Sequence, residues 1–419
     1  MQRPAGTIGS AMRNAKATAT APAAAIPAGI WVLGFVSLLM DISSEMVLSL
    51  LPVFMVTVLG VSPLVVGLIE GVSEATALIV KVFSGVLSDR LGRRKPLVLL
   101  GYGLSALLKP MFALATTASW VFAARFVDRI GKGLRGAPRD ALIADLAPAT
   151  ARGAAFGLRQ SLDVAGAFLG PLLAMGLMLL WANDFRAVFW VAVLPALLSV
   201  GLLYFGVHEP ERTGKAGAAI NPLQRAQLRR LPAAYWWVVA IAALFTLARF
   251  SQAFLVLRAA QGGLALALTP LVFIALNSVY SLAAYPLGKL ADRVDHGKLL
   301  AAGMGLLIAA DVVLAQSAHW AVVWAGVTLW GLHLAMTQGL LAAMVAETAP
   351  ADLRGTAYGF FNLASGVALL LASTVAGGVW TVFGAAVTFW CGAALAATAL
   401  VAVWLRSVWL HARAKPSSV

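Results

Sequence analysis

Long apolar runs recur along most of this 419-residue chain, and they leave few folds open to it. Each run reaches the roughly 18 residues that a helix needs to cross a hydrocarbon core of about 30 Å. Charged residues make up 11% of the chain, whereas a soluble protein carries about a quarter. Strands of a membrane barrel would show short alternating segments instead. The pattern predicts an all-α integral membrane protein.

Twelve apolar segments are long enough to span a membrane. The predicted spans are residues 30–58, 64–87, 97–116, 119–140, 155–180, 186–206, 234–257, 267–288, 299–316, 320–345, 356–379 and 383–405. The predicted domains are a disordered cytoplasmic tail at 1–29, a six-helix bundle at 30–206, a central cytoplasmic loop at 207–233, a second bundle at 234–406 and a cytoplasmic tail at 407–419.

Lysine and arginine residues gather on one side of the predicted membrane. The tails and connections on that side hold Arg3, Arg13, Lys16, Arg90, Arg93, Arg94, Lys95, Arg135, Arg139, Arg152, Arg212, Lys215, Arg225, Arg229, Arg230, Arg293, Lys298, Arg354, Arg413 and Lys415. The opposite side has only Arg186 and Arg258. The positive-inside rule therefore predicts that both termini are cytoplasmic.

The net charge of +14 raises the question of a nucleic-acid partner. We predict none, because the cations lie in short connections between apolar segments and not along a soluble face. The first 29 residues lack the continuous apolar region of a cleaved signal peptide. The single cysteine, Cys391, excludes an intrachain disulfide. We expect a monomeric multi-pass protein of the cell (inner) membrane, with the lipid bilayer around it.

The two halves of the chain repeat each other. "GVLSDRLGRRK" at 85–95 aligns with "GKLADRVDHGK" at 288–298, an offset of 203. "DLAPATARGAAFG" at 145–157 aligns with "ETAPADLRGTAYG" at 347–359, an offset of 202. Two landmarks at nearly one offset imply parallel halves related by an axis along the membrane normal. The sequence thus predicts twelve transmembrane helices in two six-helix, pseudo-symmetric bundles, a transporter design with the substrate site between the halves.

The connection after the second span carries a complete loop signature, G-x-L-S/A-D-R-x-G-R-R/K. Its residues here are Gly85, Asp89, Arg90, Gly92, Arg93 and Arg94. With the twelve spans and the repeat, this signature resembles the major facilitator superfamily over the whole chain. The resemblance implies a cytoplasmic latch that breaks and reforms as the halves move. The second copy keeps Gly288, Asp292 and Arg293 but has Asp295 in place of Gly92, so we expect a weaker latch there. A role in topology alone is the alternative, which the acid in the first copy disfavours.

The fifth span resembles the antiporter signature of the same superfamily, G-x(8)-G-x(3)-G-P-x(2)-G-G. The matching residues are Gly157, Gly166, Gly170 and Pro171. The final glycine pair is replaced by Ala174 and Met175. Small residues four apart allow close approach of another helix, and the proline removes a backbone hydrogen bond. Ordinary packing is the alternative, although the repeat partner at Ala368–Ser373 lacks the Gly-Pro pair. The resemblance implies export by exchange.

Ionisable residues are frequent in the predicted spans, although charges inside a membrane are costly and usually face the bundle interior. Asp41 and Glu45 share one face of the first span, and Glu70 and Glu74 share one face of the second. The other ionisable residues of the first half are Lys81, Lys109, Arg125, Asp128, Arg129, Arg159 and Asp163. The second half has fewer ionisable residues in its spans. Its polar candidates are Arg249, Gln252, Asp311 near an outer end, and His333.

Coupling to a proton gradient needs a group that gains and releases a proton as the cavity opens to each side. A buried carboxylate suits this task, because loss of water favours its neutral form and a nearby cation favours its charged form. We rank Asp41 and Glu45 first, then Asp128 and Glu74. The alternative for each is a fixed ion pair with Lys81, Lys109, Arg125 or Arg129. Lys81, two turns after Glu74, is placed to neutralise it.

The remaining candidates carry weaker signals. If residues 43–46 align with residues 250–253, Gln252 takes the position of Glu45. His333 stands alone on an apolar face, where a packed histidine competes with a ligand or proton-relay role. We predict no metal site and no cofactor, because no His- or Cys-rich cluster and no phosphate-binding motif occurs. No nucleophile–base–acid arrangement indicates an enzyme.

Together these features predict a proton-coupled secondary transporter working by alternating access, most simply an efflux antiporter of small organic molecules. A second interpretation keeps the fold but carries an organic anion, a metal ion or a metal chelate, by symport or export. Negative groups would then be held by Lys109, Arg125 and Arg249, and positive groups by Asp41, Glu45 and Glu70. A non-transporting receptor or scaffold is the third. The fourth span departs from the superfamily pattern R-x-x-Q-G, so the usual drug-exporter relay is not assigned.

Overall fold

The computed structural model describes residues 26–148, 150–209, 228–291, 293–316, 319–350 and 353–414. Within these ranges the regular secondary structure is helical, and no strand occurs. The predicted signature residue Asp292 lies outside the described residues. So do most of the predicted tail at 1–29, most of the central loop at 207–233 and the end of the C-terminal tail.

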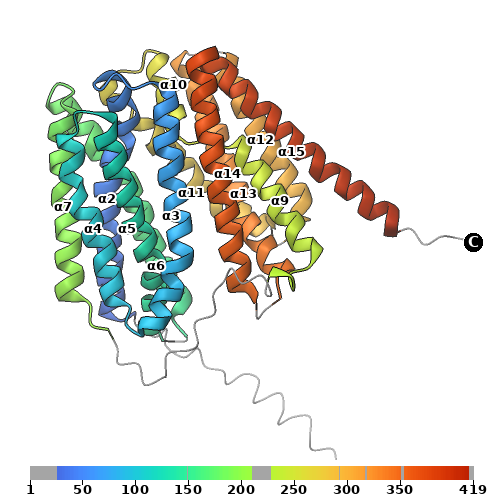
Figure 1. The fold of residues 1–419 in the computed structure, drawn as a ribbon, viewed down its shortest axis with the longest axis horizontal. Helices are drawn as coiled ribbons and strands as arrows, with labels where there is room; N and C mark the ends of the chain where they lie inside the picture. Colours follow the sequence, from blue (N-terminus) through green and yellow to red (C-terminus); the bar gives the residue numbers. More distant parts are fainter. Residues whose placement is uncertain are drawn as a thin grey trace, which may run out of the picture.

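Twelve long helical segments form the described part of the chain, as the sequence predicts. The first six are α2 (Ala28–Thr57), α3 (Pro63–Leu91), α4 (Lys95–Leu114), α5 (Ala118–Leu146), α6 (Arg152–Leu180) and α7 (Phe185–Gly206). The others are α9 (Ala233–Ala248) with α10 (Ala253–Gln261), α11 (Leu271–Ala291) preceded by the 3₁₀ turn η1 (Leu266–Leu268), α12 (His296–Gln316), α13 (Trp320–Thr348), α14 (Arg354–Phe383) and α15 (Ala385–Ala414). Figure 1 shows these two groups of helices next to each other, with α3 and α14 where they meet.

The two ends of the bundle are named by their helices. The near side is where α2 begins and α7 ends, at the bottom of Figure 1, and the far side is where α2 ends and α3 begins. Local residues set several helix boundaries. Gly92 ends α3 in the left-handed conformation, with φ of 66°, as expected of a residue without a Cβ. The Asp184 side chain accepts hydrogen bonds from the backbone N–H groups of Arg186 and Ala187 and so caps α7.

The seventh span is not the continuous helix that the sequence predicts at 234–257. α9 ends at Ala248, and α10 begins at Ala253. The backbone N–H of Ser251 donates to Ser373 Oγ of α14 (3.1 Å), and Ser251 Oγ accepts from Ala253 N–H (3.2 Å). A helix can be interrupted inside a bundle when side chains satisfy the freed backbone groups. Here Ser373 of α14 and Ser251 of the break itself do so.

α5 is the second departure. Eleven described segments are long and apolar enough to cross a membrane, and α5 is the long helix missing from that set. It also continues to Leu146, beyond the predicted end at residue 140. Arg135 and Arg139, which the charge count above assigned to a connection, lie within the helix. Their guanidinium groups have partners on α4 and α2: Arg135 donates to Ser105 Oγ (2.6 Å) and Arg139 to Ser37 Oγ (2.9 Å).

Glycines bring the two halves into contact. α3 meets α14, α6 meets α11, and α2 meets α10. A Cβ on Gly67 of α3 would lie 2.1 Å from the backbone oxygen of Ser373, and one on Gly377 of α14 would lie 2.5 Å from that of Pro63. Near the middle of both helices, a Cβ on Gly366 would lie 3.4 Å from an atom of the α3 backbone. These atomic contacts lie between the middle of the bundle and its far side.

Candidate functional site

One face of α5 carries a stripe of charged side chains. Spacings of three and four residues place them on the same side of the helix, and they are Arg125, Asp128, Arg129, Lys132, Arg135 and Arg139. α5 packs between α3 and α4 and also touches α2 and α6. The stripe therefore meets the acids of the first and second spans inside the first half.

Most of these charges form buried ion pairs. Arg125 is 3% exposed and makes two hydrogen bonds to Glu70, which is 2% exposed, at 2.7 and 3.3 Å. Lys109 of α4 lies 3.3 Å from Asp128 and donates to Ser44 Oγ (3.1 Å). For these predicted site residues the geometry agrees with fixed pairs, since both partners are shielded from water and from substrate.

Glu74 belongs to the same network, but it does not pair with Lys81 as predicted. Its carboxylate lies 3.3 Å from Arg129 and 3.8 Å from Arg125. Lys81 instead extends along Gly136 of α5, where a Cβ would meet its side-chain carbons at 3.6 Å. The prediction that Lys81 neutralises Glu74 is wrong. α5 approaches α3 closely enough that its own arginines reach the carboxylate first.

Asp41 and Glu45 differ from the other acids of the first half. Both are half-buried on α2, and neither forms an ion pair or a side-chain hydrogen bond with the residues that the structure describes. Lys132 interacts electrostatically with both of them and with Glu74. Its side chain is exposed although its neighbours on the stripe are buried, and it too forms no ion pair within the described ranges. Two carboxylates and one cation therefore remain open to water or a ligand.

The glycines of the antiporter-like signature pack directly against these two carboxylate positions. A Cβ on Gly166 of α6 would lie 2.9 Å from the Cβ of Asp41, and one on Gly170 would lie 2.7 Å from the Cβ of Glu45. Gly157, the first residue of the signature, has no neighbouring atom within 4 Å at its Cβ position. α6 remains helical through Pro171. The pair four residues apart thus positions α2 by close backbone contact, whereas Gly157 makes no such contact.

A second ionic cluster lies toward the near side. Arg159 of α6 pairs with Asp163 on its own helix and lies 3.5 Å from Asp140 of α5. Asp140 also lies 3.4 Å from Arg139. The predicted site residue Asp163 interacts electrostatically with Asp41, so this cluster adjoins the open carboxylates.

The loop signature on the near side binds residues of its own half. Arg94 pairs with Asp145 at the end of α5 (2.9 Å) and lies 4.0 Å from Asp89. The backbone N–H groups of Arg94 and Lys95 donate to the carboxylate of Glu209, which follows α7. The described contacts of Arg94 therefore tie α3, α4, α5 and α7 together.

The second signature copy is built differently. Asp295, in place of Gly92, accepts from the backbone N–H of Lys298 (3.0 Å) and caps the start of α12. Arg293 is exposed, and Gly288 has no neighbouring atom within 4 Å at its Cβ position. Where Gly92 forms a left-handed turn at the end of α3, Asp295 forms the cap at the start of α12.

The candidates of the second half lie apart from the α5 network. Arg249 and Gln252 are half-buried at the break between α9 and α10. His333 is buried, with Nδ1 2.9 Å from the backbone oxygen of Gly303 and its ring 5.0 Å from that of Phe245. This is the geometry of a packed, hydrogen-bonded histidine.

Two features were not among the residues predicted from the sequence, Lys132 and a pair of glycines on α3. Lys132 is identifiable from the three- and four-residue spacing of the α5 charges. Gly67 and Gly71 form a G-x-x-x-G pattern on α3 that indicates a close helix contact.

Asp311 lies near the far end of α12 as expected, but it is fully buried, and neither of its oxygens has a hydrogen-bond partner. A Cβ on Gly392 would lie 2.6 Å from one of them. Among the described residues no group of three or more acidic, histidine or cysteine side chains is placed to hold a metal ion.

Comparison with known proteins gives one consistent result. The family model described as Major Facilitator Superfamily matches residues 33–276 and 259–418. An uncharacterized MFS-type transporter of Methanocaldococcus jannaschii is 31% identical over 379 residues, which cover 88% of this chain and 92% of that protein. The inner membrane transport protein YajR of Escherichia coli is 26% identical, over 90% of this chain and 81% of its own length. The crystal structure of a bacterial homologue of the human lysosomal transporter Spinster, inward-facing and occupied, superimposes with a TM-score of 0.74 at 14% identity, covering 90% and 96% of the two chains.

Proposed function

Because this chain belongs to the major facilitator superfamily, a family of transporters and not of enzymes, we propose that it is a proton-coupled antiporter that exports a small organic molecule. Its described helices form a multi-pass bundle in two groups that lie next to each other. The residues proposed to carry the proton are Asp41 and Glu45.

The observation that carries the proposal is the difference in pairing among the buried acids. Glu70 and Asp128 are held by cations at short distance and shielded from water, so changing their protonation would leave a buried cation uncompensated. Asp41 and Glu45 are half-buried and have no such partner in the described structure. A proton and a substrate with a positive or hydrogen-bond-donating group would compete for these oxygens, and competition for one site is what couples exchange.

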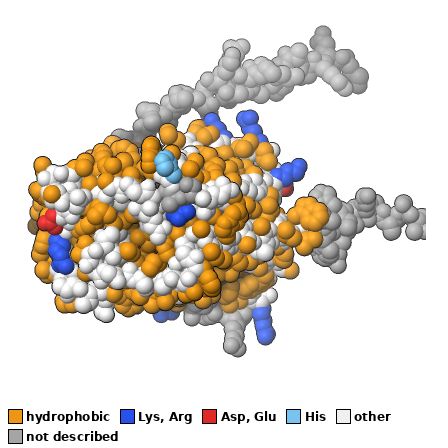
Figure 2. Space-filling model, turned by 90° about the horizontal axis from the view of Figure 1, so that it is seen from above, with side chains coloured by type: hydrophobic (Ala, Val, Ile, Leu, Met, Phe, Trp, Pro, Cys, Tyr) orange, Lys and Arg blue, Asp and Glu red, His pale blue; other side chains and the backbone are white. Residues whose placement is uncertain are grey.

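Alternating access is supported by where the two halves touch. The close glycine contacts between them, at Gly67, Gly366 and Gly377, lie between mid-bundle and the far side. We assign the near side to the cytoplasm, because the exposed cations of the described connections gather there. Figure 2, which looks onto the far side, shows a surface of mostly hydrophobic and uncharged side chains. The conformation then corresponds to a state open toward the cytoplasm in the inner membrane.

The test is proton movement in liposomes that contain the purified protein, a pH-sensitive dye and an imposed proton gradient. Lipophilic cations, organic anions, sugars and divalent metals are added in turn. We expect one class to move protons in the wild type, and Asp41→Asn or Glu45→Gln to reduce the signal to that of protein-free liposomes. Asp184→Asn, an equal charge change at the exposed cap of α7, serves as the control and should transport normally. Substrate flux without proton movement would make the protein a uniporter and refute coupling.

A disulfide across the halves tests alternating access separately. The Cβ built on Gly366 lies 3.5 Å from that of Leu78, within the range of about 3.5–4.5 Å that a disulfide requires. In a Cys391→Ala background, Leu78→Cys with Gly366→Cys should cross-link on oxidation and stop transport, and a reducing agent should restore it. Each single cysteine variant is the control. Full transport by the cross-linked protein would show that α3 and α14 need not separate.

One observation favours a second candidate function, the transport of an organic anion. Lys132 on α5 and Arg249 at the α9–α10 break are cations without an ion pair in the described structure, one in each half. The earlier candidates Lys109 and Arg125 are already engaged by Asp128 and Glu70. If anions are the cargo, Lys132→Gln and Arg249→Gln should abolish their uptake, while Asp41→Asn should spare it.

A further inference from the structure

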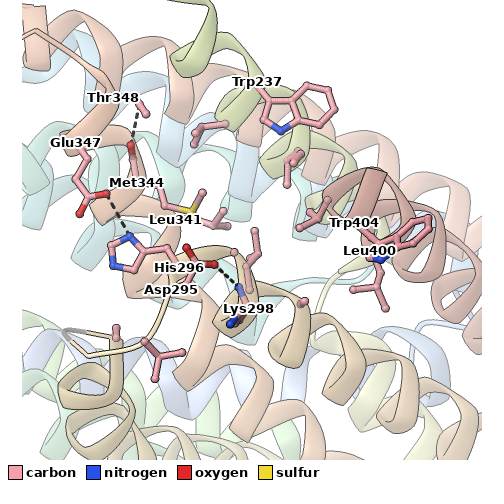
Figure 3. Close-up of a pocket in the computed structure, with 18 of the residues that line it drawn as sticks. Trp237, Asp295, His296, Lys298, Leu341, Met344, Glu347, Thr348, Leu400 and Trp404 are labelled. Carbon is pink, nitrogen blue, oxygen red and sulfur yellow. Dashed lines mark hydrogen bonds and ion pairs between the residues drawn. The ribbon is translucent and has the colours of Figure 1, made fainter. Parts of the chain in front are cut away.

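A pocket of about 1440 Å³ opens on the near side of the second half, between α9, α12, α13 and α15. Figure 3 shows Trp237 of α9 and Trp404 of α15 on either side of it, with Leu341, Met344 and Leu400 lining its apolar wall. Its polar edge is residues 293–298, which lead into α12, and the end of α13. This site shares no residue with the proposed proton site.

In the first half, buried side chains fill the place equivalent to this pocket. At the near side, α2, α4, α5 and α7 pack a core that includes Leu33, Val98, Leu142 and Leu203, all with no exposed surface. At the near-side end of this core, Arg94 is 6% exposed and pairs with Asp145.

The repeat explains why the second half differs. At the offsets of 203 and 202 residues, Gly297 stands where Arg94 stands, and Glu347 stands where Asp145 stands. The glycine supplies no side chain to cover the opening. Figure 1 shows the C-terminal end of α15 extending away from the rest of the bundle. The result is a pocket at the edge of the molecule, next to the end of a membrane-spanning helix.

The charges at the rim favour an anion. Glu347 is engaged by His296, whose Nδ1 lies 3.2 Å from its carboxylate, and Asp295 is engaged by the backbone N–H of Lys298. The side chains of Arg293 and Lys298 are exposed at the same rim and form no ion pair within the described ranges. The rim charges that form no ion pair are therefore positive, and they lie at the mouth of an apolar pocket flanked by two tryptophans. Tryptophan is enriched where a membrane meets water.

We propose that this pocket binds an anionic phospholipid. Its acyl chain occupies the space between α9 and α15, and its phosphate contacts Arg293 and Lys298. Pockets between membrane helices with basic residues at the cytoplasmic surface bind anionic headgroups by the same combination of forces. The lipid then does for the second half what Arg94 and the packed core do for the first: it fills the near-side end of the bundle.

Native mass spectrometry of the detergent-purified full chain tests the proposal, with phosphatidylglycerol and phosphatidylcholine of identical acyl chains as probes. We expect the wild type to retain phosphatidylglycerol preferentially. Lys298→Gln should weaken that binding by about fivefold, the contribution of one surface cation. Lys289→Gln on α11 removes the same charge outside the pocket and should leave binding unchanged.

A second pair of variants tests the pocket by shape and not by charge. Ala301→Phe fills the wall of the pocket and should displace the lipid, whereas Ala302→Phe, one residue along α12 and outside the pocket, should not. Equal retention of the two lipids, or equal binding by the two phenylalanine variants, would overturn the proposal. Glycerol phosphate that competes fully with the lipid would also overturn it, because the site would then be one for small anions.

Discussion

Glu70→Gln is expected to lower the free energy of unfolding by roughly 3–5 kcal/mol, the usual cost of removing one partner from a buried ion pair. The change leaves the Arg125 guanidinium, which is 3% exposed, without the carboxylate that accepts its hydrogen bonds at 2.7 and 3.3 Å. Glu74, at 3.8 Å, is the remaining acid near it and is shared with Arg129. Unfolding by a graded detergent series, followed by circular dichroism, measures the loss.

The control is an acid that is also paired but exposed. Glu347 has a side chain 59% exposed and faces His296, so Glu347→Gln should cost less than about 1 kcal/mol. A double variant, Glu70→Leu with Arg125→Met, should recover most of the stability, because removing both charges removes the uncompensated one. If Glu70→Gln proves as stable as the wild type, the pair has no structural role, and Glu70 joins Asp41 and Glu45 as a titrating candidate.

Gly170→Leu is expected to destabilise the first half by about 1–3 kcal/mol or more. Even the first carbon of a side chain at this position would lie 2.7 Å from Glu45 Cβ and 2.8 Å from the backbone oxygen of Ile42. α6 and α2 must then move apart, because neither contact is the end of a flexible chain. The residue that this movement displaces, Glu45, is a proposed proton site. Transport activity should therefore fall by more than the loss of folded protein explains.

Two glycines of the same helix provide matched controls. Gly157 and Gly176 have no neighbouring atom within 4 Å at the Cβ position. Gly157→Ala and Gly176→Ala should therefore be neutral or stabilise the helix by up to about 1 kcal/mol, the difference in helix propensity. Thermal unfolding of all three variants, with liposome transport in parallel, checks this. A destabilised Gly157→Ala together with a tolerated Gly170→Leu would show that the contact with α2 does not govern stability.

The spans were predictable because their signal is local. In a bilayer each segment must satisfy its own backbone hydrogen bonds, so a long apolar run has few alternatives to a helix. The α5 segment was predictable as a helix for the same reason, although its charges remove it from the apolar set. The break after Ala248 was not, because it depends on Ser373, which is more than a hundred residues away and meets Ser251 only in the folded bundle.

By itself the sequence determined the membrane-spanning helical class, the two repeated halves, the superfamily and the set of acids that includes the proposed proton sites. Only the tertiary structure decided which of those acids are paired. Glu70, Glu74 and Asp128 meet cations that project from α4 and α5, while Asp41 and Glu45 lie one helix away, against the glycines of α6. Spacing along a helix determines which residues share a face. Whether a charge on that face finds a partner within about 4 Å depends on how closely and at what level the neighbouring helices pack, which is a property of the whole bundle.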